Sequence, residues 1–468
     1  ALTNAQVKTL SAEFVSGLST SQVRNLGTEQ VQNLSASALS AFSESQIQAL
    51  SSSQLQAITV TQLKGLSATK LGQLSTSQVD KLTEDQIKNL SVTQVKAFTT
   101  SGIAKLTTGQ INALTAAQIR SLSTDAMAAL TTSQVPGLNA TQLKVMSDAQ
   151  FQAMASSTAG ALSTTQIKLL STAQIRGLTT SSAQALTSNL VNALSTTQMK
   201  ALSTDQVAAL STSQLSNMTG SLLSALTTDN IVALSSTQIG AITATQFPAL
   251  GTLQITAIEH TDIPSISTGA LAAFTSDQIV ALTPTQVGNL TTDQLSAITT
   301  NQMSAFGTDD INVLSSRQIG ALNTDQIDTM SVAQMQAIAS GSLKTLSSDQ
   351  IQAISTEQLS GMGTSQIRGF QYSQIPSFTT DQISTLTTAE VGAFTTRQAQ
   401  AFTSTQIRAF TAWQVPAIPV ENIANMGTAQ TSAFSTAQLS AFTSQQIASL
   451  TSDQIAAFNN TQRHALGL

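Results

Sequence analysis

The sequence predicts an all-α solenoid, a superhelix of very short capped helices with one helix in each eight-residue repeat and about 3.6 repeats in each superhelical turn. Three observations lead to this fold class. An apolar residue recurs every eight residues over the whole chain, each repeat carries a helix-start signal, and acidic and basic residues occupy different positions of the repeat.

The repeat keeps one register from Leu2 to Leu466. With its positions called a to h and a at Leu2, every a is Leu, Ile, Met or Phe, and no insertion or deletion interrupts the series. Position f is mostly Ile or Val, and the consensus is Leu-Ser/Thr-x-x-Gln-Ile-x-Ala. A fixed short period indicates one repeat array in place of the several domains that 468 residues would otherwise suggest.

Each octad contains the signal for a helix start. Ser or Thr at b followed by Gln at e is a capping box, in which the hydroxyl accepts a hydrogen bond from the amide of e and the Gln side chain returns to the amide of b. The apolar residues at a and f match the two members of a hydrophobic staple. We therefore expect a helix to begin after b in each octad.

Charged residues support short helices independently. Most acidic residues stand at c, d or e, as Asp85 and Asp125 do, and most basic residues stand at g, as Lys64 and Arg120 do. A helix dipole favours acids in the first turn and bases in the last. The alternative is an array of short strands, which the β-branched residues at f favour.

The helices must end within each octad. At about 100° per residue, a continuous helix would rotate its apolar stripe by about 80° in each octad and lose any single buried face. Proline at g restricts the residue before it, so in those octads we expect a single helical turn over c to f. Five octads have proline at g: Pro136, Pro248, Pro264, Pro376 and Pro416.

We interpret the spacing of the octads without Gln at e as close to 3.6 octads, or about 29 residues, and this interpretation is the origin of the predicted 3.6 octads per turn. We interpret these positions as a row on one side of the superhelix and as a candidate lateral contact row between molecules. The row consists of Ala38, Lys70, Gly102, Ala126, Thr158, Ser182, Asn230, Ala270, Asp310, Ser342, Glu390 and Asn422.

Composition excludes several classes of protein. A net charge of -5 argues against a dedicated nucleic-acid binder, and the absence of cysteine excludes disulfides and thiolate metal sites. No apolar run is long enough for a membrane span. We expect a single continuous solenoid over residues 1–468 with a degenerate terminal repeat at 459–468.

The charges are unevenly distributed along the chain. Residues 1–200 have a net charge of +5 and residues 201–468 a net charge of -10. Bases at g and, later, acids at d recur about once per turn. Such charges commonly form solvated faces; alternatively, complementary ends steer copies into register.

The sequence shows no catalytic or cofactor motif, and we expect neither enzymatic activity nor a cofactor. Glu259, His260 and Asp262 are neighbours on one short turn, a poor geometry for convergence on a metal ion. Tyr372 and Trp413 fall at c and d, which should face outward.

The runs LTEDQI, LSTDQV and LTSDQI resemble the Leu-Thr/Ser-x-x-Gln-Ile/Val octads of very long, low-complexity surface and extracellular proteins of bacteria. This resemblance, with the low charge and the lack of cysteine, implies an exported structural protein of bacteria. Because a solenoid exposes apolar residues at its ends unless capping repeats cover them, we also expect self-association, head to tail and laterally, into an extracellular filament, sheath or adhesin stalk. The alternative is a solenoid that binds a peptide or glycan on one face. A binding module should carry one cluster of unusual exposed residues, whereas a filament should repeat its changes along a row.

Overall fold

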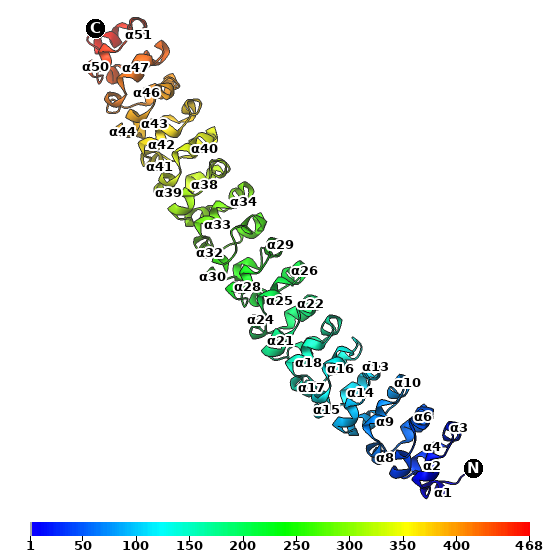
Figure 1. Ribbon diagram of the computed structural model, residues 1–468. Coiled ribbons are helices and arrows are strands. Elements are labelled where there is room, and N and C mark those ends of the chain that lie inside the picture. Colours follow the sequence, from blue (N-terminus) through cyan, green and yellow to red (C-terminus); the bar gives the residue numbers. More distant parts are fainter. Residues whose placement is uncertain (1) are drawn as a thin grey trace. The chain divides into compact units, whose positions relative to one another are not determined.

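The computed structural model describes residues 2–468, which contain helices and no strand. The chain divides into two compact units, one ending at Leu234 and one running from Ser235 to Leu468. The first unit contains the helices from α1 (Asn4–Lys8) to α28 (Thr228–Val232), and the second those from α29 (Ser236–Gly240) to α52 (Asn460–Ala465). In each unit the short helices follow one another in successive turns of a solenoid (Figure 1). The predicted all-α fold class is confirmed.

Every α-helix begins at position c and lasts four to six residues. In α15 (Ala116–Ser121), the hydroxyl of Thr115 accepts a hydrogen bond from the amide of Gln118, and the amide of Thr115 donates to Gln118 Oε1 at 2.6 Å. This capping box recurs in most octads of both units. Because the box is encoded within four residues, it can start a helix wherever it occurs. The residues 2–468 contain no strand, so the strand alternative is wrong for them.

Proline at g changes the local structure more than expected. Four of these octads contain a turn followed by a 3-10 helix over f to h, in place of an α-helical turn over c to f. They are η1 (Val135–Gly137), η2 (Phe247–Ala249), η3 (Ile263–Ser265) and η6 (Val415–Ala417). In the fifth, Pro376 lies inside the longer η5 (Tyr372–Ser377). Proline lacks the amide that an α-helix needs at this position.

Helices pack against the helix three octads further along the chain. In the first unit, α12 (Val92–Lys96) contacts α15, and α15 contacts α17 (Ala140–Val145); in the second, α38 (Thr324–Thr329) contacts α40 (Ser348–Ala353). Hydrogen bonds between turns join residues 25 to 31 positions apart, as from Gln48 to Gln73 and from Gln46 to Val15. One turn therefore contains between three and four octads, in agreement with the prediction.

The core of each unit consists of the side chains at a and f. Ile87 and Ile111, both at f, and Leu90 and Leu114, both at a, are buried in the first unit. In the second unit several a positions are Phe, and neighbouring rings pack edge to face, with 5.0 Å between the centroids of Phe394 and Phe402. Such pairs add aromatic contact to the burial itself, so the late Phe residues have a packing role.

Residues 459–468 keep the repeat structure despite their divergent sequence. Asn459 caps α52 and forms a capping box with Gln462, while Arg463 takes the apolar position f. The prediction of one continuous solenoid over 1–468 remains a prediction.

Among residues 2–468, no helix has the length and apolar character needed to cross a membrane.

Candidate functional site

The glutamine at e has a second role that sequence reasoning missed. Gln118 is 1% exposed, and besides closing its capping box it donates from Nε2 to the carbonyl oxygens of Ile87 at 2.9 Å and Leu90 at 2.8 Å. These two residues lie 31 and 28 positions earlier, in the preceding turn. The amide group thus accepts with its oxygen and donates with its nitrogen, which an ionised carboxylate cannot do.

The same geometry occurs in the second unit. Gln326 Oε1 accepts from the amide of Asn323 at 2.8 Å, while Nε2 donates to the carbonyl oxygens of Leu295 at 2.8 Å and Ile298 at 2.7 Å. We call this arrangement the glutamine clamp: a buried Gln at e whose Oε1 bonds its own N-cap amide and whose Nε2 bonds carbonyls 31 and 28 residues earlier. The clamp pairs the N-cap amide and the carbonyl 28 residues earlier, adds a second hydrogen bond to the carbonyl 31 residues earlier, and joins consecutive turns.

The sequence did contain a signal for the clamp. A capping box accepts Glu as readily as Gln, yet position e is Glu only at Glu390. That preference indicates a need for a hydrogen-bond donor, which an ionised carboxylate lacks.

The candidate lateral contact row is wrong as a surface. Its members lie beside the core residues at f and are buried, apart from Lys70, which is half-buried and donates from Nζ to the carbonyl oxygen of Ser40. Position e faces the preceding turn, so these side chains cannot meet another molecule. The residues concerned are Ala38, Lys70, Gly102, Ala126, Thr158, Ser182, Asn230, Ala270, Asp310, Ser342, Glu390 and Asn422.

Two residues of this row, Asn422 and Ser342, and Asp262, which also stands at e but outside the row, replace the clamp with other hydrogen bonds. Asn422 Nδ2 donates to the carbonyl oxygen of Phe394 at 2.8 Å, 28 residues earlier, which reproduces one clamp bond. Asp262 cannot donate, and its Oδ1 instead accepts from the hydroxyl of Ser236 at 2.5 Å. Ser342 lies 3.1 Å from the hydroxyl of Ser316. The missing glutamines therefore mark local changes in the contact between turns.

Glu390 is the least well satisfied of these side chains. Its Oε2 accepts from the amide of Thr387 at 2.6 Å, but Oε1 is buried without a hydrogen-bond partner among residues 2–468. Burial raises the pKa of Glu390, opposed by hydrogen bonds from Thr387. Burial likewise raises the pKa of Asp310, with a smaller contribution from the charge of Asp309.

The residues considered for a metal site, Glu259, His260 and Asp262, do not form one in the structure. Within 2–468, no group of three or more His, Cys, Asp or Glu side chains could hold a metal ion. Glu259 and His260 are exposed, whereas Asp262 is buried and bonded to Ser236. The three neighbours therefore do not converge.

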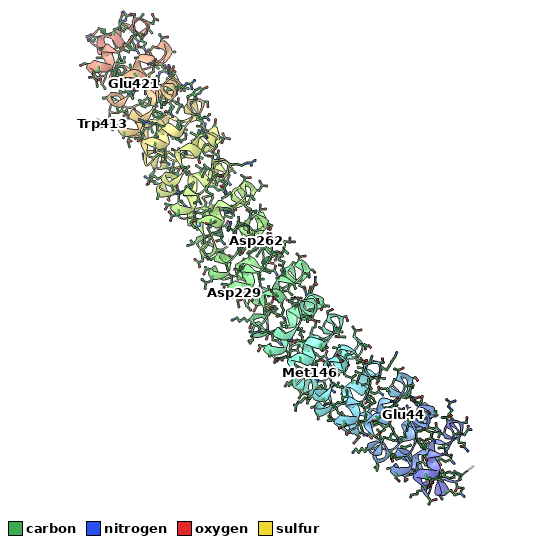
Figure 2. All side chains as sticks on the ribbon, viewed as in Figure 1. Glu44, Met146, Asp229, Asp262, Trp413 and Glu421 are labelled. Carbon is green, nitrogen blue, oxygen red and sulfur yellow. The ribbon has the colours of Figure 1, made fainter. Side chains whose placement is uncertain are left out.

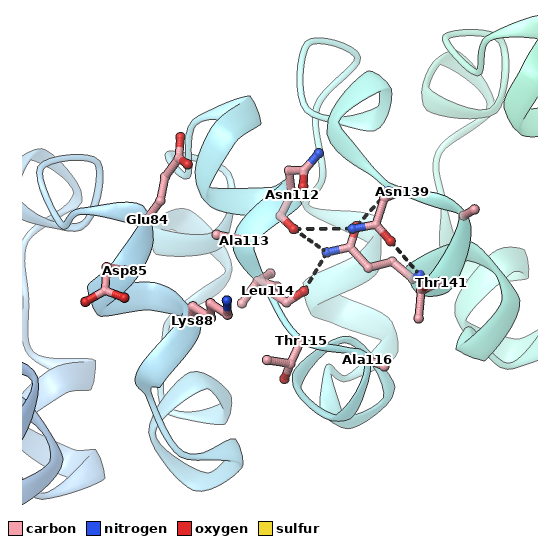
Figure 3. Close-up of a pocket in the computed structure, with 12 residues that line it drawn as sticks. Glu84, Asp85, Lys88, Asn112, Ala113, Leu114, Thr115, Ala116, Asn139 and Thr141 are labelled. Carbon is pink, nitrogen blue, oxygen red and sulfur yellow. Dashed lines mark hydrogen bonds between the residues drawn. The ribbon is translucent and has the colours of Figure 1, made fainter.

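A shallow cavity of about 710 Å³ lies on the first unit between three stacked octads (Figure 3). Its lining includes Glu84, Lys88 and Asn139. Asn139 Nδ2 donates to the carbonyl oxygen of Asn112 at 3.3 Å, and its Oδ1 accepts from the amide of Gln142 at 3.1 Å. Its central polar groups are thus already used in capping and clamping.

Two exposed aromatic residues stand on the second unit, as their positions predicted. Trp413 is 82% exposed and projects from the surface (Figure 2), and Tyr372 is 54% exposed. The guanidinium carbon of Arg397 lies 5.4 Å from the centroid of the Tyr372 ring, a cation–π contact. Tyr372, Arg397 and Gln400 line a groove of about 530 Å³.

A family model for the ALTTAQ repeat matches six segments, at residues 103–139, 191–220, 223–252, 255–292, 303–340 and 423–460. The chain is a repeat protein. Within the first match, residues 113–118 read ALTAAQ, which covers positions h to e of the octad and ends at the clamp residue Gln118. A comparison with curated proteins gives no match.

Proposed function

We propose that this repeat protein is a structural, self-associating protein of the bacterial cell surface or exterior, which forms a filament, a sheath or an adhesin stalk. Its repeated polar positions are occupied by caps and clamps, and its apolar positions by the core. Its most regular property is the clamp that joins one turn to the next. The function of such a chain depends on its shape and on its contacts with other copies of itself.

The observation that carries this proposal is the glutamine clamp. Gln118 in the first unit and Gln326 in the second each join their turn to the preceding turn through buried hydrogen bonds. The same contact repeats along both units, so the length of such a chain depends on its number of repeats. Phe14 is 52% exposed and offers an apolar contact to a second copy. A contact between unlike surfaces of two copies continues without closing into a ring.

Light scattering and negative-stain microscopy of the 468-residue chain test the proposal. Particle length should grow with protein concentration, and salt should weaken growth without abolishing it, because apolar contacts persist when charges are screened. Phe14→Asp, which places a charge on the first turn, should reduce growth at least tenfold. Leu253→Asp, at a side chain 75% exposed in the second unit, is the matched control. A chain that stays monomeric at every concentration would contradict self-association.

The alternative function is that of a binding module for a peptide or glycan. The groove beside Tyr372 favours it, since an aromatic ring, a guanidinium and an amide converge there. Titration with a panel of oligosaccharides and short peptides, followed by Tyr372 and Trp413 fluorescence, tests this alternative. Binding that is lost in Tyr372→Ala but kept in Trp413→Ala would favour the groove; no binding by any member of the panel would count against it.

A further inference from the structure

Three sets of exposed charges share one spacing along the chain. Each consists of four residues of the same sign, separated by 24, 8 and 24 positions. Basic quartet 1 and basic quartet 2 lie at position g of the first unit, and the acidic quartet at position d of the second. Basic quartet 1 is Lys64, Lys88, Lys96 and Arg120; basic quartet 2 is Lys144, Lys168, Arg176 and Lys200; the acidic quartet is Asp325, Asp349, Glu357 and Asp381. All twelve side chains are exposed.

This spacing gathers each quartet on one face of its unit. Relative to the first charge, the others lie three, four and seven octads away. Because one turn contains between three and four octads, the second and third charges lie one turn on, to either side of the first. The fourth lies close to two turns on, again in line with the first. Each quartet is therefore a diamond of four charges.

Helix contacts confirm that the charges within a quartet lie on stacked turns. Helix α8 (Val60–Gly65), with Lys64, contacts α11 (Glu84–Asn89), with Lys88. In the second unit, α38 and α40 bring Asp325 and Asp349 onto adjoining turns. Three further pairs are in contact: α12 with α15, α21 (Thr172–Gly177) with α24 (Thr196–Lys200), and α41 (Thr356–Ser360) with α43 (Thr380–Thr385).

The quartets take no part in ion pairs within the described chain. The one ion pair among residues 2–468 joins Lys81 to its neighbour Asp80 at 3.3 Å. Between residues 86 and 204, which contain seven of the eight residues of the basic quartets, the only acidic residues are Asp125 and Asp148. The helix dipole accounts for a base at g or an acid at d in any one octad. It does not account for the gathering of four like charges on adjoining turns, where they repel one another. A partner of opposite charge compensates that repulsion.

We propose that the acidic quartet of one copy docks side by side on a basic quartet of a second copy. This inference rests on the proposed self-association, but it adds a lateral surface distinct from the ends. A second copy carries its charges on the same octad lattice, so the layouts of the two diamonds correspond and their signs are opposite. The order 24, 8, 24 reads the same from either end, so the layout is unchanged when one chain is reversed. Complementary patches of this kind steer association and fix its register.

A charge exchange in the full chain tests the docking. Variant A carries Glu at all eight positions of the two basic quartets, and variant B carries Lys at the four positions of the acidic quartet. Each alone should associate laterally at least tenfold more weakly than the parent chain. An equimolar mixture should regain association, because the acidic diamonds of A then face the basic diamond of B. Analytical ultracentrifugation at low salt and negative-stain microscopy measure the effect.

The control for variant B has the same net charge with the acidic quartet intact: Glu259→Lys, Asp277→Lys, Glu421→Lys and Asp453→Lys together. It should associate laterally like the parent. A carbodiimide links amines to carboxylates directly. In a mixture of light and heavy-isotope chains, where links between copies can be recognised by mass, it should join Lys144 or Lys168 of one copy to Asp349 or Asp381 of another.

Several outcomes would overturn the proposal. One is a variant B that associates like its control, and another is a mixture of A and B that fails to regain association. Links between copies confined to the terminal turns would leave end-to-end growth intact and exclude lateral docking. If variant A lost retention on immobilised heparin while its self-association was unchanged, the basic quartets would be assigned to a polyanion instead. A chain that is monomeric under all conditions would contradict both the lateral and the end contacts.

Discussion

At the scale of single residues, the side chain at e determines how firmly two turns are joined. Gln118→Ala should leave the amide of Thr115 and the carbonyl of Leu90 without the clamp bonds, at a cost of about 1–3 kcal/mol for each buried group left unpaired. The carbonyl of Ile87 keeps its hydrogen bond from the amide of Leu90. Gln22→Ala, on the exposed first turn, loses only its capping box and should cost about 1 kcal/mol or less. Urea unfolding measures the loss in free energy of unfolding for each variant. Equal losses would show that the clamp adds no stability beyond that of the capping box.

Glu390 gives a pH dependence at the same scale. Because burial raises its pKa, the native state binds the proton more tightly than the unfolded chain does. The resulting stability is fully present below the ordinary pKa of 4.5 and is lost as the pH rises through the raised native pKa. Glu390→Gln should therefore raise the free energy of unfolding at pH 7, by about 1–3 kcal/mol if the new amide satisfies buried groups. The gain should shrink toward pH 4. A difference between the two chains that does not change with pH would contradict this account.

At the scale of the element, each helix depends on its cap and on the adjoining turns. Ser195, Ser203 and Ser211 cap α24, α25 (Thr204–Ala208) and α26 (Thr212–Ser216). Changing one of them to Ala should cost about 0.5–2 kcal/mol. The triple variant should unfold the segment locally, because helices of one turn persist only through contact with neighbours. Hydrogen exchange over residues 190–220 measures this, and protection equal to that of the parent chain would contradict it.

At the scale of the whole molecule, the chain should tolerate changes of length in units of eight residues. Deletion of residues 194–201, one complete octad, brings equivalent donors and acceptors into the places of those removed. We expect a folded chain with the parent's helix content and a melting temperature within a few degrees of it. Deletion of residues 194–197 shifts a, e and f out of register and should unfold the surrounding turns. Circular dichroism with thermal melting distinguishes the two deletions. Equal losses of helix content and melting temperature in both would show that the octad is not the structural unit.

The sequence alone determined the octad register, the helix starts and the period of the superhelix, because each depends on chemistry within a few residues or on regular repetition. Thr115 and Gln118 encode a cap whatever surrounds them. Only the tertiary structure decided what the Gln118 Nε2 atom binds, since its acceptors on Ile87 and Leu90 lie in the preceding turn. Stacking of the turns also decided the burial of position e. The sequence predicted a surface row there, through residues such as Ala270 and Ser342, but these side chains are buried. On a helix of one turn, local pattern does not say which side meets the next turn; the stacking of turns does.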